Sequence, residues 1–564
     1  MFAKIVSGSL SKGLIAAICN GGPEDRKIGE LTIINGVKGK FLALISDITL
    51  DNSTLSRRIV EDSLKSQTPD SFFENFHTKT LGVNISLIPL AYFNENSGEL
   101  QRIDTIPRHL SNVGYAADND IQLFYGKPDF KTLWPIGKPL KSNVEIPLDI
   151  DALTKTSFGI FGKSGVGKTF LGNLIAALIT ASDTGRNTKL LIFDMHSEYG
   201  DTVKDSKGAS YENGVSWIFP EEFNIYTPCR MLHNELIKKT KTGKHPNIER
   251  FNISIDDIDV DDLVSCYKAL GISEKFIQNM YVIVQKARKL ISKEPRGRWL
   301  RNILLYYEDI DILDSEDVKK CEKFLKELKP PERITFDSAM NRLRRIIKFK
   351  EDFINVESTQ ISHIDSADRI VDDLLYHGKN VVVSFGRFGD DELVYTLICN
   401  IIAGRLRRAI LNKLFKGERL NNKIIIFLEE AHRFLGPEVF YRTPFGDIAR
   451  ELRKRGVTLC VIDQRPSQLD ENVTAMLWNK IILCLTESRD VEEASRGLPF
   501  ESLFKELIPK LKRREALIFG EAVNIPVIVQ ILDYKEGIEK IAKVYYEGGK
   551  ILEDKFRKIL LNMD

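Results

Sequence analysis

The chain has 564 residues, so two to four domains of about 100–200 residues each are expected. Hydrophobic residues make up 43% and charged residues 28%, the composition of an ordinary globular protein. With 81 basic and 79 acidic side chains the formal net charge is +2, which excludes a strongly basic or strongly acidic chain. A surface for an anionic partner must therefore come from local clustering of charge, or from an oligomer that gathers basic residues in one place.

Cysteine usage and hydropathy indicate the compartment. The seven cysteines show no metal-ligand spacing, which favours free thiols in a reducing cytoplasm. No apolar run approaches the ~20 residues needed to cross a bilayer, so we expect a cytoplasmic protein with no membrane contact. The stretch LIAAIC at 14–19 is too short for a signal peptide and predicts a β-strand instead.

Residues 1–150 consist of short apolar runs separated by glycine and Asn/Asp turns, the pattern of a small β-barrel or sandwich. Only residues 51–80 depart from this pattern and look more helical or irregular. The stretch 134–150 leads into the next domain. We expect an N-terminal β-barrel domain over 1–150.

From residue 151 a strand, a glycine-rich loop, a helix and a second strand at 189–195 follow one another, and such a unit builds a parallel sheet. Short apolar runs typical of strands buried on both faces recur at 380–385, 423–430, 457–463, 480–486 and 515–520. The sequence therefore predicts an α/β core in two parts, 151–235 and 371–532.

Two further segments lie outside this pattern. Residues 236–370 are rich in Lys, Glu, Asp and Ile with helical spacing, which predicts a helical insertion into the core. Residues 533–564 have the pattern of one or two amphipathic helices and form the predicted tail.

The stretch GKSGVGKT at 162–169 fits the phosphate-loop pattern G-x-x-x-x-G-K-[ST] and stands between a predicted strand and a predicted helix. Its glycines let backbone N–H groups turn inward, and the helix N-terminus adds a positive dipole end. Lys168 is expected to contact the β- and γ-phosphates, and Thr169 to bind Mg²⁺. The predicted cofactors are ATP and Mg²⁺, and the predicted nucleotide-binding residues are Gly162, Ser164, Gly165, Val166, Gly167, Lys168, Thr169 and Phe170.

Acidic residues end two of the predicted strands. Glu429 follows KIIIFL and is predicted to bind the metal, with Glu430 as the catalytic base; a strand ending in a charged surface turn is the alternative. Asp194 opens DMHSEY and would emerge at the carboxyl edge of the sheet. Asp194 is predicted to bind Mg²⁺ or to lie close to it or to the attacking water, and a loop cap without chemistry is the alternative.

Three more residues are candidates for the hydrolytic step. Gln464 ends the strand at 457–463 and is predicted to sense the γ-phosphate or orient water. Arg450 and Arg453 stand three apart on a predicted helix, hence on one face, and either could reach a neighbouring subunit's site. Arg453 is favoured. An ordinary solvated helix that pairs its arginines with nearby acids is the alternative.

These motifs together resemble the HerA family of hexameric ATPases, within the HerA/FtsK group of DNA-pumping motors. The resemblance is carried by GKSGVGKT, DMHSEY, LEEAHRFL, the stretch 448–473 and LIFGEAVNIPV at 517–527. The chain departs from the family pattern at RELRK (450–454), at Ser197, where a glycine is usual, and at KRREAL (512–517), where Gly-Glu-Ala-Leu is usual. These departures suggest a divergent branch.

The resemblance implies a RecA-like P-loop core in a six-membered ring around duplex DNA, acting as an ATP hydrolase of the DNA translocase or helicase type. ATP would lie between subunits, with Lys168 and Glu430 from one subunit and an arginine from the next. The barrel domain would dock a separate partner, either a NurA-like nuclease or an anti-phage effector such as a sirtuin-type NADase or another nuclease.

The expectation of DNA binding rests on the resemblance, because the basic clusters near 342–350, 405–408 and 510–514 are each more often solvated helix faces. The alternative function is a nucleotide-regulated ring scaffold that assembles and activates an effector without processive translocation.

Overall fold

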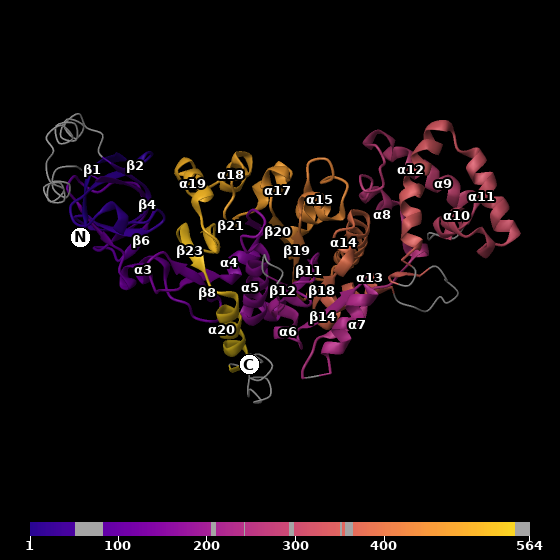
Figure 1. Cartoon of the computed structure of the whole chain (residues 1–564), viewed down its shortest axis with the longest axis horizontal. Coiled ribbons are helices and arrows are strands. Elements are labelled where there is room, and N and C mark those ends of the chain that lie inside the picture. Colours follow the sequence, from indigo (N-terminus) through magenta and orange to yellow (C-terminus); the bar gives the residue numbers. More distant parts are fainter. Residues whose placement is uncertain are drawn as a thin grey trace, which may run out of the picture.

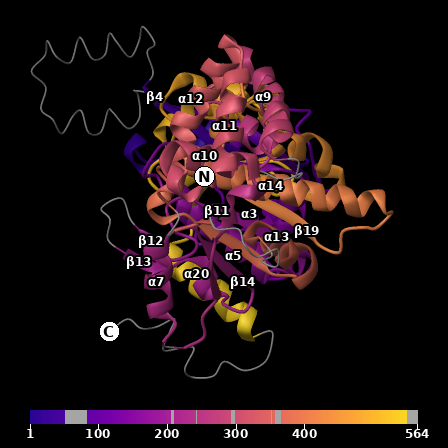
Figure 2. The same ribbon diagram turned by 90° about the vertical axis from the view of Figure 1, so that its right-hand side faces the viewer.

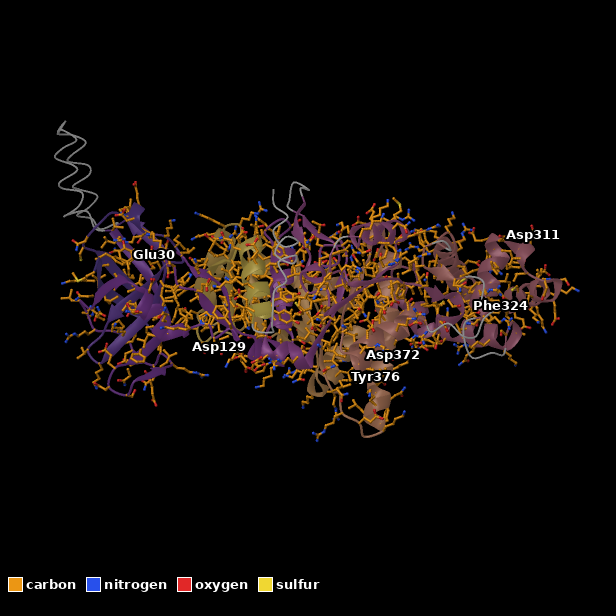
Figure 3. All side chains as sticks on the ribbon, turned by 90° about the horizontal axis from the view of Figure 1, so that it is seen from below. Glu30, Asp129, Asp311, Phe324, Asp372 and Tyr376 are labelled. Carbon is orange, nitrogen blue, oxygen red and sulfur yellow. The ribbon has the colours of Figure 1, made fainter. Side chains whose placement is uncertain are left out.

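The computed structural model describes residues 1–50, 83–204, 210–241, 243–292, 298–349, 352–355 and 365–547. The molecule is elongated, with a β-barrel at one end, an α/β core in the middle and a group of helices at the other end (Figure 1). Seen from below, Glu30 marks the barrel end and Phe324 the helical end (Figure 3). The predicted α/β class, the barrel and the helical insertion are confirmed.

The barrel is a closed ring of six antiparallel strands. The strands follow the order β2-β1-β7-β3-β4-β5, and β5 pairs back onto β2. Phe2, Phe41 and Leu87 fill its interior. The strand predicted at 14–19 is β2, and the segment predicted to be irregular, 51–80, lies almost wholly beyond the described residues. The strands are β1 (Ala3–Ser9), β2 (Gly13–Ile18), β3 (Leu31–Asn35), β4 (Gly39–Leu50), β5 (Val83–Asn94), β6 (Glu99–Gln101) and β7 (Asn112–Tyr115).

The barrel ends earlier than the predicted boundary at residue 150. β8 (Leu133–Pro139) and β9 (Ile146–Asp149) leave the barrel and join the core sheet, where β8 pairs antiparallel with β23 (Val527–Ile531). The pairing joins segments almost 400 residues apart, with Val529 opposite Pro139, and no local pattern could indicate it.

The core is a 12-stranded sheet in the order β15-β14-β18-β11-β19-β20-β10-β21-β22-β23-β8-β9. Neighbours from β15 to β21 run parallel, and those from β21 to β9 run antiparallel. The remaining strands of this sheet are β10 (Phe158–Phe161), β11 (Thr188–Asp194), β14 (Phe223–Thr227), β15 (Asn247–Arg250), β18 (Asn380–Ser384), β19 (Lys423–Glu429), β20 (Val457–Asp463), β21 (Asn479–Ile482) and β22 (Glu515–Phe519). A separate hairpin pairs β12 (Thr202–Lys204) with β13 (Ser210–Asn213).

Helices cover this sheet, so its central strands are almost entirely buried. The C-terminal helix α20 (Tyr534–Glu547) packs on α5 (Lys168–Ala181) through the rings of Tyr534 and Phe170, whose centroids are 5.5 Å apart. The other helices of the core and its borders are α3 (Asp118–Tyr125), α4 (Ile150–Lys155), α6 (Val215–Ile218), α7 (Arg230–Lys239), α13 (Ser366–Asp372), α14 (Glu392–Phe415), α15 (His432–Leu435), α16 (Pro444–Asp447), α17 (Glu471–Met476), α18 (Ser488–Ser495) and α19 (Glu501–Leu507).

The helical insertion is shorter than the predicted 236–370, because α7 and β15 belong to the core. Its helices enclose Trp299, Phe324 and Phe336, each fully buried, and they stand in front when the molecule is viewed from that end (Figure 2). A short parallel pair, β16 (Ile253–Ser254) with β17 (Ile354–Asn355), closes its base. The helices are α8 (Val260–Ser265), α9 (Ile277–Leu290), α10 (Arg298–Glu308), α11 (Ser315–Glu327) and α12 (Pro330–Ile347).

All seven cysteines lie within the described ranges and are free thiols, as predicted, and all but Cys19 are buried. Over those same ranges, no helix combines the length and the apolar character that crossing a bilayer would require.

Candidate active site

A cavity of about 230 Å³ opens at the carboxyl edge of the parallel strands. The predicted motifs meet there because β10, β20, β19 and β11 are consecutive neighbours in the sheet and all run in the same direction. The cavity is lined by Ser164, Gly165, Gly167, Lys168, Thr169, Phe170, His196, Glu198, Glu429, Glu430, Ile462, Gln464 and Arg513.

The phosphate loop connects β10 to α5. Gly165 and Gly167 have φ of +76° and +109°, the left-handed region that a side chain disfavours. Gly162 and Val166 lie behind the loop rather than on the cavity wall, because a Cβ at Gly162 would come within 2.9 Å of atoms of both Val166 and Leu483. The first residues of α5, Lys168 to Phe170, line the cavity, and a helix N-terminus is a place where phosphate binds.

Lys168 is held inside this loop. Its Nζ donates hydrogen bonds to the carbonyl oxygens of Gly162 and Lys163, at 2.8 and 3.0 Å. Burial lowers the pKa of Lys168 below its usual value, against the opposing effect of the carboxylates of Glu430, Asp463 and Glu429. The negative charge of a nucleotide phosphate would offset the free-energy cost of burying this ammonium group.

Glu429 fits a metal site. Its side chain is buried, and its Oε2 atom has no hydrogen-bond partner within the described structure. Burial, with smaller contributions from Asp194, Glu198 and Glu430, raises the pKa of Glu429 well above its usual value. A bound Mg²⁺ would compensate this carboxylate, and the Thr169 hydroxyl on the same cavity wall is a second oxygen donor.

Asp194, predicted to bind Mg²⁺ or lie close to it, is not among the residues that line the cavity. Its carboxylate is completely buried and accepts hydrogen bonds from the backbone N–H groups of Glu198, Tyr199 and Gly200 and from the hydroxyl of Ser384. The structure thus favours the loop-cap alternative, in which Asp194 shapes the turn that carries His196 and Glu198 into the cavity wall. Burial raises the pKa of Asp194 to about 7.

Glu430 and Gln464 are joined by a hydrogen bond at the cavity wall. The Nε2 atom of Gln464 donates a hydrogen bond to Oε1 of Glu430 at 2.7 Å. Glu430 has φ of +48°, an uncommon conformation for a non-glycine residue, and such strain concentrates at active sites. A water molecule near this pair would find a carboxylate to accept its proton and an amide to orient it.

A partly buried histidine–aspartate pair, not predicted from the sequence, lies beside Glu430. Asp463 ends β20 and accepts hydrogen bonds from the backbone N–H and the Nδ1 atom of His432, at 2.8 and 3.0 Å. Burial lowers the pKa of His432, but the hydrogen bond and charge of Asp463, together with Glu430, outweigh it and raise the pKa. The sequence places His432 just after one predicted strand and Asp463 at the end of another. Only the order of the strands in the sheet makes the two residues neighbours.

Arg450 and Arg453 do not line the cavity of their own chain. They belong to a π-helical turn (448–452) and a 3₁₀ turn (453–455), so the α-helical spacing that would put them on one face does not apply. Arg450 pairs with Asp447 and lies over the ring of Tyr441, 4.8 Å from its centroid. Arg453 is half-buried and forms no ion pair with any residue that the structure describes.

A larger cavity of about 430 Å³ lies between the insertion and the core. Its charged groups are largely engaged with one another, for example Arg407 with Asp447 and Glu451, and Arg442 with Glu274. The smaller cavity is the candidate active site because it alone contains the phosphate loop.

The smaller cavity defines the class of the protein: it is a P-loop ATPase. Residues 134–406 match the family model described as "Helicase HerA, central domain". The chain is similar to proteins named DNA double-strand break repair helicase HerA, from Pyrococcus furiosus (23% identity, covering 83% of this chain and 82% of the relative) and Sulfurisphaera tokodaii (26%, 77% and 75%). Among solved structures it is similar to the bacterial conjugative coupling protein TrwBdeltaN70, with 13% identity, a TM-score of 0.45, and coverage of 73% of this chain and 96% of that one.

Two departures from the family pattern fall where the backbone has positive φ. Ser197 has φ of +61° and Arg514 has φ of +67°, and the resemblance leads us to expect glycine at both positions. Each side chain makes contacts that glycine cannot make: the Ser197 hydroxyl accepts a hydrogen bond from the N–H of Gly386, and Arg514 pairs with Asp533 at 2.8 Å. These contacts offset part of the strain of about 1–2 kcal/mol that a side chain incurs in this conformation.

Proposed function

We propose that the chain forms a hexameric ring that hydrolyses ATP to move along double-stranded DNA. The observation that carries the proposal is the gathering of Lys168, Thr169, Glu429, Glu430 and Gln464 around one cavity. These groups supply phosphate binding, metal binding and activation of water, which a nucleotide-binding protein without turnover does not need. The DNA part rests on the relatives, which are named as DNA double-strand break repair helicases.

In this proposal Thr169 and Glu429 would hold Mg²⁺, which would supply positive charge to the phosphates. Lys168 binds the β- and γ-phosphates. Glu430 takes a proton from the attacking water, which Gln464 orients. Ser164, Gly165, Gly167 and Phe170 line the same cavity and would contact the nucleotide.

The position of the two arginines supports a ring. Arg450 and Arg453 lie on the same connection that leaves Glu430, yet neither reaches the cavity of its own chain. In the proposed ring Arg453 enters the neighbour's site and stabilises charge that develops in the transition state. Arg453 suits this role better than Arg450, whose guanidinium is already engaged by Asp447.

A near-neutral subunit is compatible with a DNA channel, because each basic residue facing the channel is repeated by the ring symmetry. Such contacts are made to phosphates, so binding would be independent of sequence and would weaken with salt.

We further propose that a separate nuclease or anti-phage effector docks on the barrel. The barrel lies at one end of the molecule (Figure 1), and Val37 and Leu110 expose 69% and 66% of their surface there. The alternative, a nucleotide-regulated scaffold for the same effector, requires ATP turnover without movement.

Displacement of a triplex-forming strand from linear duplex DNA tests the proposal. We expect ATP-dependent displacement by the wild-type protein and none by Glu430→Gln. Hydrolysis without displacement would favour the scaffold.

A further inference from the structure

We propose that Arg513 is a second cationic contact for the phosphates of the nucleotide, supplied by the same chain that supplies Lys168. Arg513 lines the nucleotide cavity although it comes from a segment that no phosphate-binding motif includes. The inference rests on the ATPase class of the protein and not on movement along DNA.

The direction of β22 explains how Arg513 reaches the cavity. β22 runs antiparallel to β21, with Ile482 opposite Leu517, so the start of β22 lies at the edge where the parallel strands end. Cys484 links the segment before β22 to the phosphate loop. Its Sγ lies 3.6 Å from the carbonyl oxygen of Pro509. Its own carbonyl oxygen accepts a hydrogen bond from the N–H of Lys163 at 2.9 Å.

The turn that carries Arg513 is fixed on both sides. The N–H of Glu515 donates to the carbonyl oxygen of Lys512 at 3.0 Å, and the neighbouring Arg514 is anchored by Asp533 and by the carbonyl oxygen of Ile531. The side chain of Arg513 is exposed, and no ion pair engages it in the described parts of the chain. A phosphate in the cavity would give it a partner.

The charge of the cavity wall calls for such a cation. The described lining includes one lysine, Lys168, and one arginine, Arg513, against three acidic residues, Glu198, Glu429 and Glu430. A nucleotide triphosphate adds further negative charge that one lysine and one Mg²⁺ do not balance. The guanidinium fork suits this task, because it can donate two parallel hydrogen bonds to phosphate oxygens.

The test compares Arg513→Ala and Arg513→Lys with Lys512→Ala, an exposed neighbour outside the cavity. Equilibrium binding of ATP, ADP and adenosine and steady-state hydrolysis are measured without DNA, and thermal unfolding confirms that each variant folds. We expect Arg513→Ala to raise the Kd for ATP and ADP roughly tenfold to a hundredfold. We expect adenosine binding to be unchanged, Arg513→Lys to be intermediate and Lys512→Ala to match the wild type.

Unchanged Kd values for ATP and ADP in folded Arg513→Ala would overturn the proposal, and so would an equal loss for adenosine, which has no phosphate. An error in the proposed movement along DNA would give a different result. The hydrolysis rate of the wild type would then not respond to DNA, while the effect of Arg513→Ala on nucleotide binding would persist.

Discussion

The side-chain amide of Gln464 donates a hydrogen bond to the carboxylate of Glu430 across 2.7 Å. The two residues follow the adjacent parallel strands β20 and β19, so the sheet itself sets their separation. Both residues also line the cavity beside Lys168, so the proposed base and the proposed water-orienting amide lie side by side at the phosphate loop.

Glu430→Gln should bind ATP as the wild type does but lower kcat by roughly 10²–10⁴, because the group that accepts the proton is lost. Radiolabelled phosphate release and equilibrium binding measure the two quantities. Glu451→Gln is a matched control, because Glu451 is exposed and pairs with Arg407 away from the cavity. Normal turnover in Glu430→Gln would refute the assignment of the base.

Gln464→Ala should lower kcat roughly tenfold to a hundredfold and leave KM nearly unchanged, because the orienting hydrogen bond is lost while the phosphate contacts remain. Steady-state kinetics over a range of ATP concentrations separates the two constants. A rise in KM with unchanged kcat would instead assign Gln464 to nucleotide binding.

Lys168→Ala should abolish detectable hydrolysis and weaken ATP binding, because it removes the cation that the loop carbonyls hold in place. Titration with a fluorescent ATP analogue measures the loss. Lys163→Ala provides the control, since Lys163 is exposed and contributes its backbone rather than its side chain. Equal defects in the two variants would point to general damage of the loop.

Arg453→Ala should retain nucleotide binding and lose hydrolysis in the assembled ring. Mixing Arg453→Ala with Lys168→Ala subunits should restore activity, because the first supplies intact ATP sites and the second supplies intact arginines to its neighbours. Assay of the mixture at several ratios tests this point. No recovery at any ratio, with subunit exchange verified, would contradict the assignment in trans.

Burial of Asp194 should make stability depend on pH. Its pKa of about 7 in the folded protein exceeds the value of about 3.9 expected in the unfolded chain, so the folded state binds more protons between these values. The free energy of unfolding should therefore fall as pH rises from about 4 to about 7. This dependence should be weaker in Asp194→Asn, measured by urea unfolding without nucleotide, and an identical dependence in both proteins would show that Asp194 does not cause it.

Local patterns were sufficient for much of the fold and site. The strands β10, β11, β19 and β20 were predictable from apolar runs. The phosphate loop, Glu430 and Gln464 were predictable because each directly follows one of these strands. The boundary near β8 was not, because its partner β23 is far away in the sequence. The pairing of His432 with Asp463 and the approach of Arg513 depend on strand order and direction, which the sequence alone does not specify.

The steady-state ATPase rate of the purified protein, with and without linear duplex DNA, tests the central claim most directly. The account predicts strong stimulation by duplex that is lost in both Lys168→Ala and Glu430→Gln. A wild-type rate indifferent to DNA, at low salt where phosphate contacts are strongest, would contradict the motor and leave the scaffold as the better account.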